Sequence, residues 1–196
     1  MNKKIFINSF IVFMIILSIS GCNQSNTIYA VNVIDTETTC SSEVSYTLDF
    51  SEYGFMLKAP CKMEDVSAHA SGDFLLNYGG ITDADNPKKM TAYQLIVTCL
   101  PIGYKDMDKK DLTNKIDTLI ESRMSSMKNV TPINFGYEGY KGYVGETSYN
   151  GMKQKGVIFA KDNYIISLTV ITNDNLVAKF NKYTNSFKTV STKNTK

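Results

Sequence analysis

The chain has 196 residues, 43% of them hydrophobic, and its 21 basic and 19 acidic residues give a formal net charge of +2. Lys3 and Lys4 account for this excess, so the rest of the chain is balanced. A chain with balanced charge lacks the excess of positive charge that attracts nucleic-acid phosphates. We therefore expect no nucleic-acid partner. The ten Phe and twelve Tyr residues supply aromatic mass for one hydrophobic core.

Residues 1–21 have the pattern of a secretory signal peptide. Asn-Lys-Lys at residues 2–4 gives a positive start, and the apolar run 5–19 is shorter than the about 20 residues of a spanning helix. The stretch Leu-Ser-Ile-Ser-Gly-Cys, residues 17–22, then resembles the bacterial lipobox. That resemblance implies that Cys22 is acylated and becomes the first residue of the mature chain. The alternative is an ordinary signal peptide followed by a chance cysteine.

An anchor of this kind predicts a location at the bacterial cell envelope, with the membrane as one partner. Asn23, rather than Asp, follows the cysteine. By resemblance to proteobacterial sorting, this favours the outer membrane if the cell has one. Residues 22–45 are polar and are predicted to form a lipidated tether. The remaining chain fits a single domain at 46–190 with a frayed tail at 191–196.

Three strands are predicted in the first half of this domain, because apolar residues alternate there with a period of two. The predicted strands cover residues 55–61, 73–80 and 91–101. Pro60 and Pro101 mark the ends of the first and the third.

A helix is predicted over 109–128, where apolar residues recur at steps of three and four. Asp108 or Asp111 is the expected N-cap, and Pro132 lies beyond the end of the helix.

Three further strands and a second helix complete the predicted domain. Strands at 140–149 and 152–160 flank Asn150-Gly151, a strong signal for a tight hairpin. Residues 164–172 alternate as a third strand, and a helix from about 174 to 187 follows, with Asn173 as its N-cap.

This order predicts an α+β fold with an antiparallel sheet of about six strands and two main helices that cover it. The order also resembles the PsbP-like fold of a photosystem II extrinsic subunit, a Ran-binding import factor and DcrB-like bacterial lipoproteins. The resemblance rests on four landmarks: YGFMLKAP (53–60), the 109–128 helix, GYKGY (139–143) before the hairpin, and FNKYTNSF (180–187). It implies an α/β/α sandwich with the sheet in the centre, and a binding or assembly module without a shared active site.

Catalytic and metal-binding residues are sparse in the sequence. His69 is the only histidine and lies in a polar stretch between two strands, which is typical of a solvated loop residue. Zinc sites usually need several His or Cys ligands. No catalytic residue, metal or cofactor is therefore expected, and the chain is not expected to be an enzyme.

Three cysteines remain after Cys22, in a compartment that permits disulfides. Cys61 and Cys99 follow the first and third strands, which run in the same direction in a three-strand meander. A Cys61–Cys99 bridge is therefore predicted. Two buried thiols, or a bridge that uses Cys40, are the alternatives.

The segment GYEGYKGYV, residues 136–144, repeats Gly-Tyr three times. It is either a loop that enters a strand with bulges at its glycines, or an exposed binding patch of Tyr137, Tyr140 and Tyr143, with Tyr149 nearby.

The leading functional hypothesis is a lipid-anchored envelope protein whose domain binds another envelope protein or helps assemble a complex. A carrier of a small apolar ligand in a cleft between sheet and helix is the alternative, and an enzyme of unrecognised type is a third.

Overall fold

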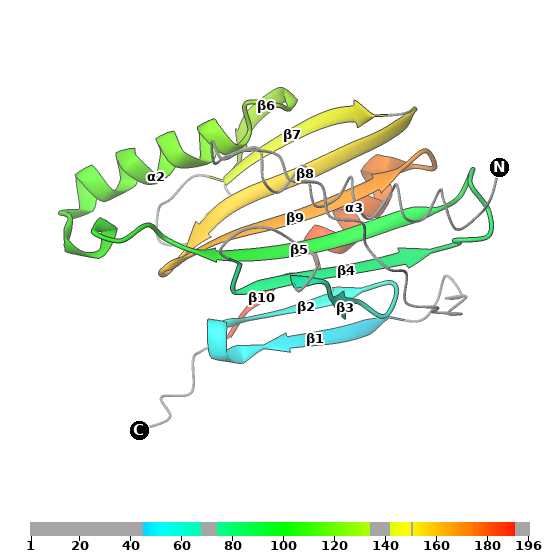
Figure 1. The fold of residues 1–196 in the computed structure, drawn as a ribbon, viewed down its shortest axis with the longest axis horizontal. Helices are drawn as coiled ribbons and strands as arrows, with labels where there is room; N and C mark the ends of the chain where they lie inside the picture. Colours follow the sequence, from blue (N-terminus) through cyan, green and yellow to red (C-terminus); the bar gives the residue numbers. More distant parts are fainter. Residues whose placement is uncertain (1–44, 68–73, 134–141, 150, 191–196) are drawn as a thin grey trace.

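The computed structural model describes residues 45–67, 74–133, 142–149 and 151–190. Within these ranges the chain forms one large antiparallel sheet, one small sheet and two α-helices (Figure 1). The α+β class and the two main helices predicted from the sequence are confirmed.

The large sheet has seven strands in the order β3-β4-β5-β9-β8-β7-β6. Every neighbouring pair in it is antiparallel. The strands are β3 (Glu64–Asp65), β4 (Leu76–Thr82), β5 (Thr91–Cys99), β6 (Lys128–Ile133), β7 (Gly142–Tyr149), β8 (Met152–Lys161) and β9 (Tyr164–Thr172).

The small sheet joins the two ends of the domain. Its strands are β1 (Tyr46–Phe50), β2 (Phe55–Ala59) and β10 (Lys188–Thr189), with β2 in the centre. A short 3-10 helix, η1 (Ser51–Tyr53), connects β1 to β2 and ends at Gly54, whose φ of 77° favours glycine.

The first α-helix, α2 (Lys109–Arg123), begins at one of the two predicted caps. Asp108 accepts hydrogen bonds from the backbone N–H groups of Lys110, at 2.9 Å, and Asp111, at 3.1 Å. These bonds satisfy two of the donors that a helix N-terminus leaves open. They also lower the pKa of the Asp108 carboxyl. A second 3-10 helix, η3 (Tyr104–Asp106), precedes α2.

The second α-helix, α3 (Leu176–Thr184), lies against the face of the large sheet that α2 does not cover. Odd-numbered residues of β5 and β8 and even-numbered residues of β9 point to this face, where Phe180 and Tyr183 of α3 and the small sheet cover them. The other parity includes Ala160 and Ile165, which pack with Ile116 and Ile120 of α2. The domain is thus layered with α2 on one face and α3 with the small sheet on the other.

Some predicted boundaries differ from the structure. The helix predicted over 109–128 ends at Arg123, and residues 128–133, which were assigned to no strand, pair with β7 as an edge strand of the seven-stranded sheet. Asn129 has a φ of 53° and the register of β6 with β7 shifts between Lys128 and Thr131, so β6 carries a bulge near its start. α3 starts after Asn175, with a φ of 47°, rather than after the predicted cap Asn173.

Gly80 in β4 leaves room for the chain that returns beside it. A Cβ atom there would lie 2.7 Å from Cys61 Sγ and 2.7 Å from the backbone oxygen of Lys62. We expect Gly80→Ala to lower the free energy of unfolding by about 1–3 kcal/mol, because a backbone atom cannot move aside easily.

Gly156→Ala is the matched control for this substitution. Its Cβ would meet Met127 Cε and Thr169 Oγ1, both at 3.3 Å, and both belong to side chains that can shift. Urea denaturation should show a larger fall in the midpoint for Gly80→Ala than for Gly156→Ala. Equal midpoints would contradict the close approach of residues 61–63 to β4.

Candidate functional site

A polar pocket lies on the α2 side of the large sheet, and strand register builds its floor. Gln94 of β5 pairs with Thr169 of β9, which pairs in turn with Gly156 of β8. In the neighbouring row, Ile96 pairs with Ser167, which pairs with Ile158 of β8. Side chains at paired positions lie on the same face of a sheet, so these two rows form one surface.

The end of α2 forms the other wall of the pocket. Gly145 and Gly156 leave space for the two methionines of this segment: a Cβ on Gly145 would lie 2.8 Å from Met124 Cε, and one on Gly156 would lie 3.3 Å from Met127 Cε. Arg123 Nη1 donates a hydrogen bond to Thr98 Oγ1 at 3.0 Å and ties the last turn of α2 to β5.

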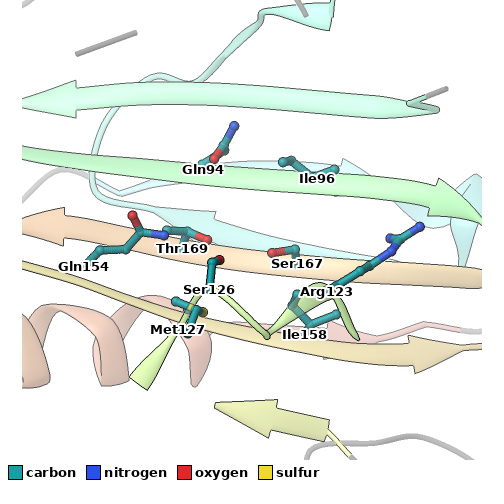
Figure 2. Close-up of a pocket in the computed structure, with 10 residues that line it drawn as sticks. Gln94, Ile96, Arg123, Ser126, Met127, Gln154, Ile158, Ser167 and Thr169 are labelled. Atoms are coloured by element: carbon teal, nitrogen blue, oxygen red, sulfur yellow. The ribbon is translucent and has the colours of Figure 1, made fainter. Parts of the chain in front are cut away.

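Sheet and helix end together enclose about 50 Å³. Figure 2 shows Gln94, Ser167, Thr169 and Gln154 projecting from the strands, with Arg123 at the end of α2 and Ser126 and Met127 in the segment that follows it. Because one water needs a cavity volume of about 10–15 Å³, the space suits a few waters or a small polar group.

Two buried amides give the pocket its polarity. Gln94 and Gln154 are each only 4% exposed. Gln94 Nε2 donates to Oδ1 of Asn77 at 3.2 Å, which fixes the orientation of the Gln94 amide. Gln154 Oε1 and Asn77 Nδ2 are buried, and neither has a hydrogen-bond partner among the described residues.

The lining is suited to hydrogen bonding rather than to proton transfer. It combines two amides, three hydroxyls and one guanidinium with apolar side chains. Amides and aliphatic hydroxyls do not titrate near neutral pH, so they bind and orient groups.

The sequence prediction missed this pocket. Its signal was three uncharged polar residues, Gln94, Gln154 and Ser167, whose positions in their strands place them on the same face as apolar residues such as Ile96 and Ile158.

The structure describes only part of the predicted tyrosine patch. Tyr137 and Tyr140 lie outside the described residues, and of Tyr149 only the backbone in β7 is described. Tyr143 is 5% exposed and packs in the core beneath α2, where its hydroxyl donates to Glu121 Oε1 at 3.0 Å. The assignment of Tyr143 to an exposed patch was therefore wrong.

The predicted Cys61–Cys99 bridge was also wrong, since both residues are thiols. β2 belongs to the small sheet rather than to a meander with β5, so Cys61 is buried beside Gly80. Gly80 pairs with Tyr93, and Cys99 lies six positions further along β5. At about 3.3 Å per residue this is about 20 Å, far beyond the about 7 Å between Cα atoms that a disulfide allows. Cys22 and Cys40 lie outside the described residues.

Neither a metal centre nor a spanning helix emerges from the described ranges. No group of three or more His, Cys, Asp or Glu side chains in them is arranged to hold a metal ion. No helix in them is long and apolar enough to cross a bilayer. His69 lies outside these ranges.

Comparisons with known proteins gave similarity only at the level of structure. No protein-family model matches the chain, and no curated protein matches its sequence. Its structure is similar to that of cyanobacterial PsbP (CyanoP) from Synechocystis sp. PCC 6803, with 12% identity and a TM-score of 0.47, over 81% of this chain and 98% of that one. It is also similar to LpqN, described as involved in cell envelope biogenesis of Mycobacterium tuberculosis, with 15% identity and a TM-score of 0.41, over 69% and 83% of the two chains.

Substitution of Tyr143 separates a core role from a surface role. We expect Tyr143→Phe to cost about 0.5–1.5 kcal/mol for the lost hydrogen bond, and Tyr143→Ala to cost about 3–5 kcal/mol. Tyr104→Phe is the matched control, because Tyr104 packs in the same cluster and its hydroxyl has no hydrogen-bond partner among the described residues. If Tyr143→Ala were as stable as wild type in urea, the core assignment of Tyr143 would be wrong and the surface assignment would be supported.

The same tyrosine predicts a dependence on alkaline pH. Burial, followed by the hydrogen bond to Glu121, raises the pKa of Tyr143 to about 12. A group whose folded-state pKa is raised stabilises the fold below its unfolded pKa, here about 10, and loses this contribution as pH rises through the folded value. Between pH 10 and 12, the stability gap between wild type and Tyr143→Phe should therefore narrow.

The two thiols should differ in reactivity, because Cys99 is exposed and Cys61 is 1% exposed. We expect iodoacetamide to modify Cys99 in the native protein without reductant, and Cys61 only after unfolding. Peptide mapping by mass spectrometry locates each label. If both residues resisted alkylation until a reductant was added, the predicted disulfide between them would be supported after all.

Proposed function

We propose that this chain is a lipid-anchored protein of the bacterial cell envelope whose domain binds another envelope protein or helps assemble a complex, without catalysing a reaction. The observation that carries the proposal is the segment 17–22, which ends a signal-like run with a lipobox cysteine. Asn23 after that cysteine supports the outer membrane, in a cell that has one.

The physics of lipid anchoring supports stable attachment at Cys22. Each buried methylene contributes about 0.8 kcal/mol, so one acyl chain holds a protein marginally and two or three hold it firmly. The polar stretch 22–45 would then connect the lipid to the domain.

The described pocket supports a binding role over an enzymatic one. Its amides and hydroxyls recognise hydrogen-bonding groups and supply no acid or base near neutral pH. The same polarity and the volume of about 50 Å³ do not favour a carrier of an elongated apolar ligand.

Substitution of Cys22 tests both parts of the proposal. We expect the wild-type chain to incorporate labelled palmitate and to sediment with membranes, and Cys22→Ser to do neither. Crosslinking in intact cells, followed by mass spectrometry, should capture the same envelope protein in each replicate with wild type. Cys22→Ser should lose that capture, because it no longer shares a surface with its partner.

Cys99→Ser is the matched control, since it removes a thiol from the domain and leaves the lipobox intact. It should keep the label, the membrane fraction and the captured partner. Unlabelled wild-type chain in the soluble fraction would overturn the anchor. A labelled chain that captured no protein would overturn the assembly role alone.

A further inference from the structure

The least explained group in the described structure is the amide oxygen of Gln154. Its side chain lines the polar pocket and is 4% exposed, and Oε1 has no hydrogen-bond partner among the described residues. A buried acceptor that receives no donor from the protein is costly unless the pocket supplies one. Because Gln154 lines a pocket, a group bound there can supply that donor.

The charge of the pocket narrows the class of that donor. Arg123 is the one charged side chain among the lining residues, and its own role is structural: it bonds Thr98 and lies in the last turn of α2, where a cation favours the helix dipole. A positive charge there disfavours an ammonium donor. A carboxylate has only acceptor oxygens to present to Gln154 Oε1, so it does not satisfy that atom.

A neutral hydroxyl fits both conditions, because it donates one hydrogen bond and accepts others. It can donate to Gln154 and accept from Ser126, Ser167 or Thr169. Ile96, Met127 and Ile158 add an apolar side to the same pocket. That combination matches a sugar or a polyol, whose hydroxyls alternate with C–H surface.

We propose that this pocket binds a neutral, hydroxyl-rich ligand, either a small polyol or the end unit of an envelope glycan. The pocket admits a few hydroxyl-bearing atoms rather than an entire oligosaccharide. The inference goes beyond the assembly role: the pocket chemistry is independent of the anchor at Cys22, whereas an envelope glycan as its source rests on the proposed location.

Met127 provides a reporter inside the pocket, and Met63 provides a reference in the core on the other face of the sheet. The full chain, carrying 13C-methyl methionine in a detergent without sugar headgroups, is titrated with glycerol, glucose and N-acetylglucosamine. We expect at least one probe to shift the Met127 methyl signal saturably in the millimolar range and to leave Met63 in place.

Gln154→Leu removes the acceptor and should weaken this binding about tenfold, the effect of one hydrogen bond to a buried amide. Lys153→Leu is the matched control, because residue 153 is exposed and neighbouring strand residues point to opposite faces. It should bind like wild type. The Met63 signal also shows whether Gln154→Leu is folded. If it is not, Ser167→Ala serves as the pocket variant instead.

Three results would overturn the assignment. The first is a Met127 signal that no probe moves at 50 mM, on the order of ten times the expected dissociation constant. The second is equal binding by wild type and both pocket variants. The third is a stronger shift with sodium acetate than with any sugar, which would make the pocket an anion site at Arg123.

Purified cell-wall glycan strands separate the two sources of the ligand. Cosedimentation of wild type with the strands, lost in Gln154→Leu, would support a glycan end as the ligand. Binding of a probe in solution without cosedimentation would support a free polyol or sugar.

Discussion

The large sheet is buried on both faces, and the rest of the domain is arranged around that constraint. Every residue of β5 from Thr91 to Thr98 is buried. A sheet of this kind needs cover on each side. α3 and the small sheet supply it on one face, and α2 packs at one end of the other face, over Ala160 and Ile165. The polar pocket begins where the last turn of α2 ends.

The small sheet depends on residues near the far end of the chain. Phe187, just after α3, stacks on Phe55 of β2 with centroids 5.2 Å apart and meets Phe159 of β8 edge-on at 5.1 Å. Ser186 Oγ accepts from the Lys58 N–H and donates to the Lys58 carbonyl. These contacts, together with the pairing of β10 with β2, make residues 186–189 part of the folded domain, with Phe187 packed against its core.

The sequence pattern predicted the features that depend on neighbouring residues, such as strand parity, helix caps and turns. It failed for contacts between residues that are distant in the sequence. The parity of β5 and β9, the cap at Asp108 and the turn at Gly151, with a φ of 78°, follow from periods and from the conformations that single residues favour. No period within 55–61 shows that β2 pairs with β1 and β10 instead of joining the large sheet. The disulfide prediction failed for that reason, and Tyr143 was misplaced because α2, which covers it, is an earlier and separate element.

The pocket shows why burial and function need to be weighed together. Leaving a buried amide oxygen unbonded costs about 1–3 kcal/mol, in a domain whose net stability is of the order of 5–15 kcal/mol. An apolar side chain at residue 154 would avoid that cost and would suit its strand neighbour Ile171. Packing alone therefore favours an apolar residue here. The amide becomes advantageous when a donor enters the pocket, and the proposed hydroxyl-bearing ligand is such a donor.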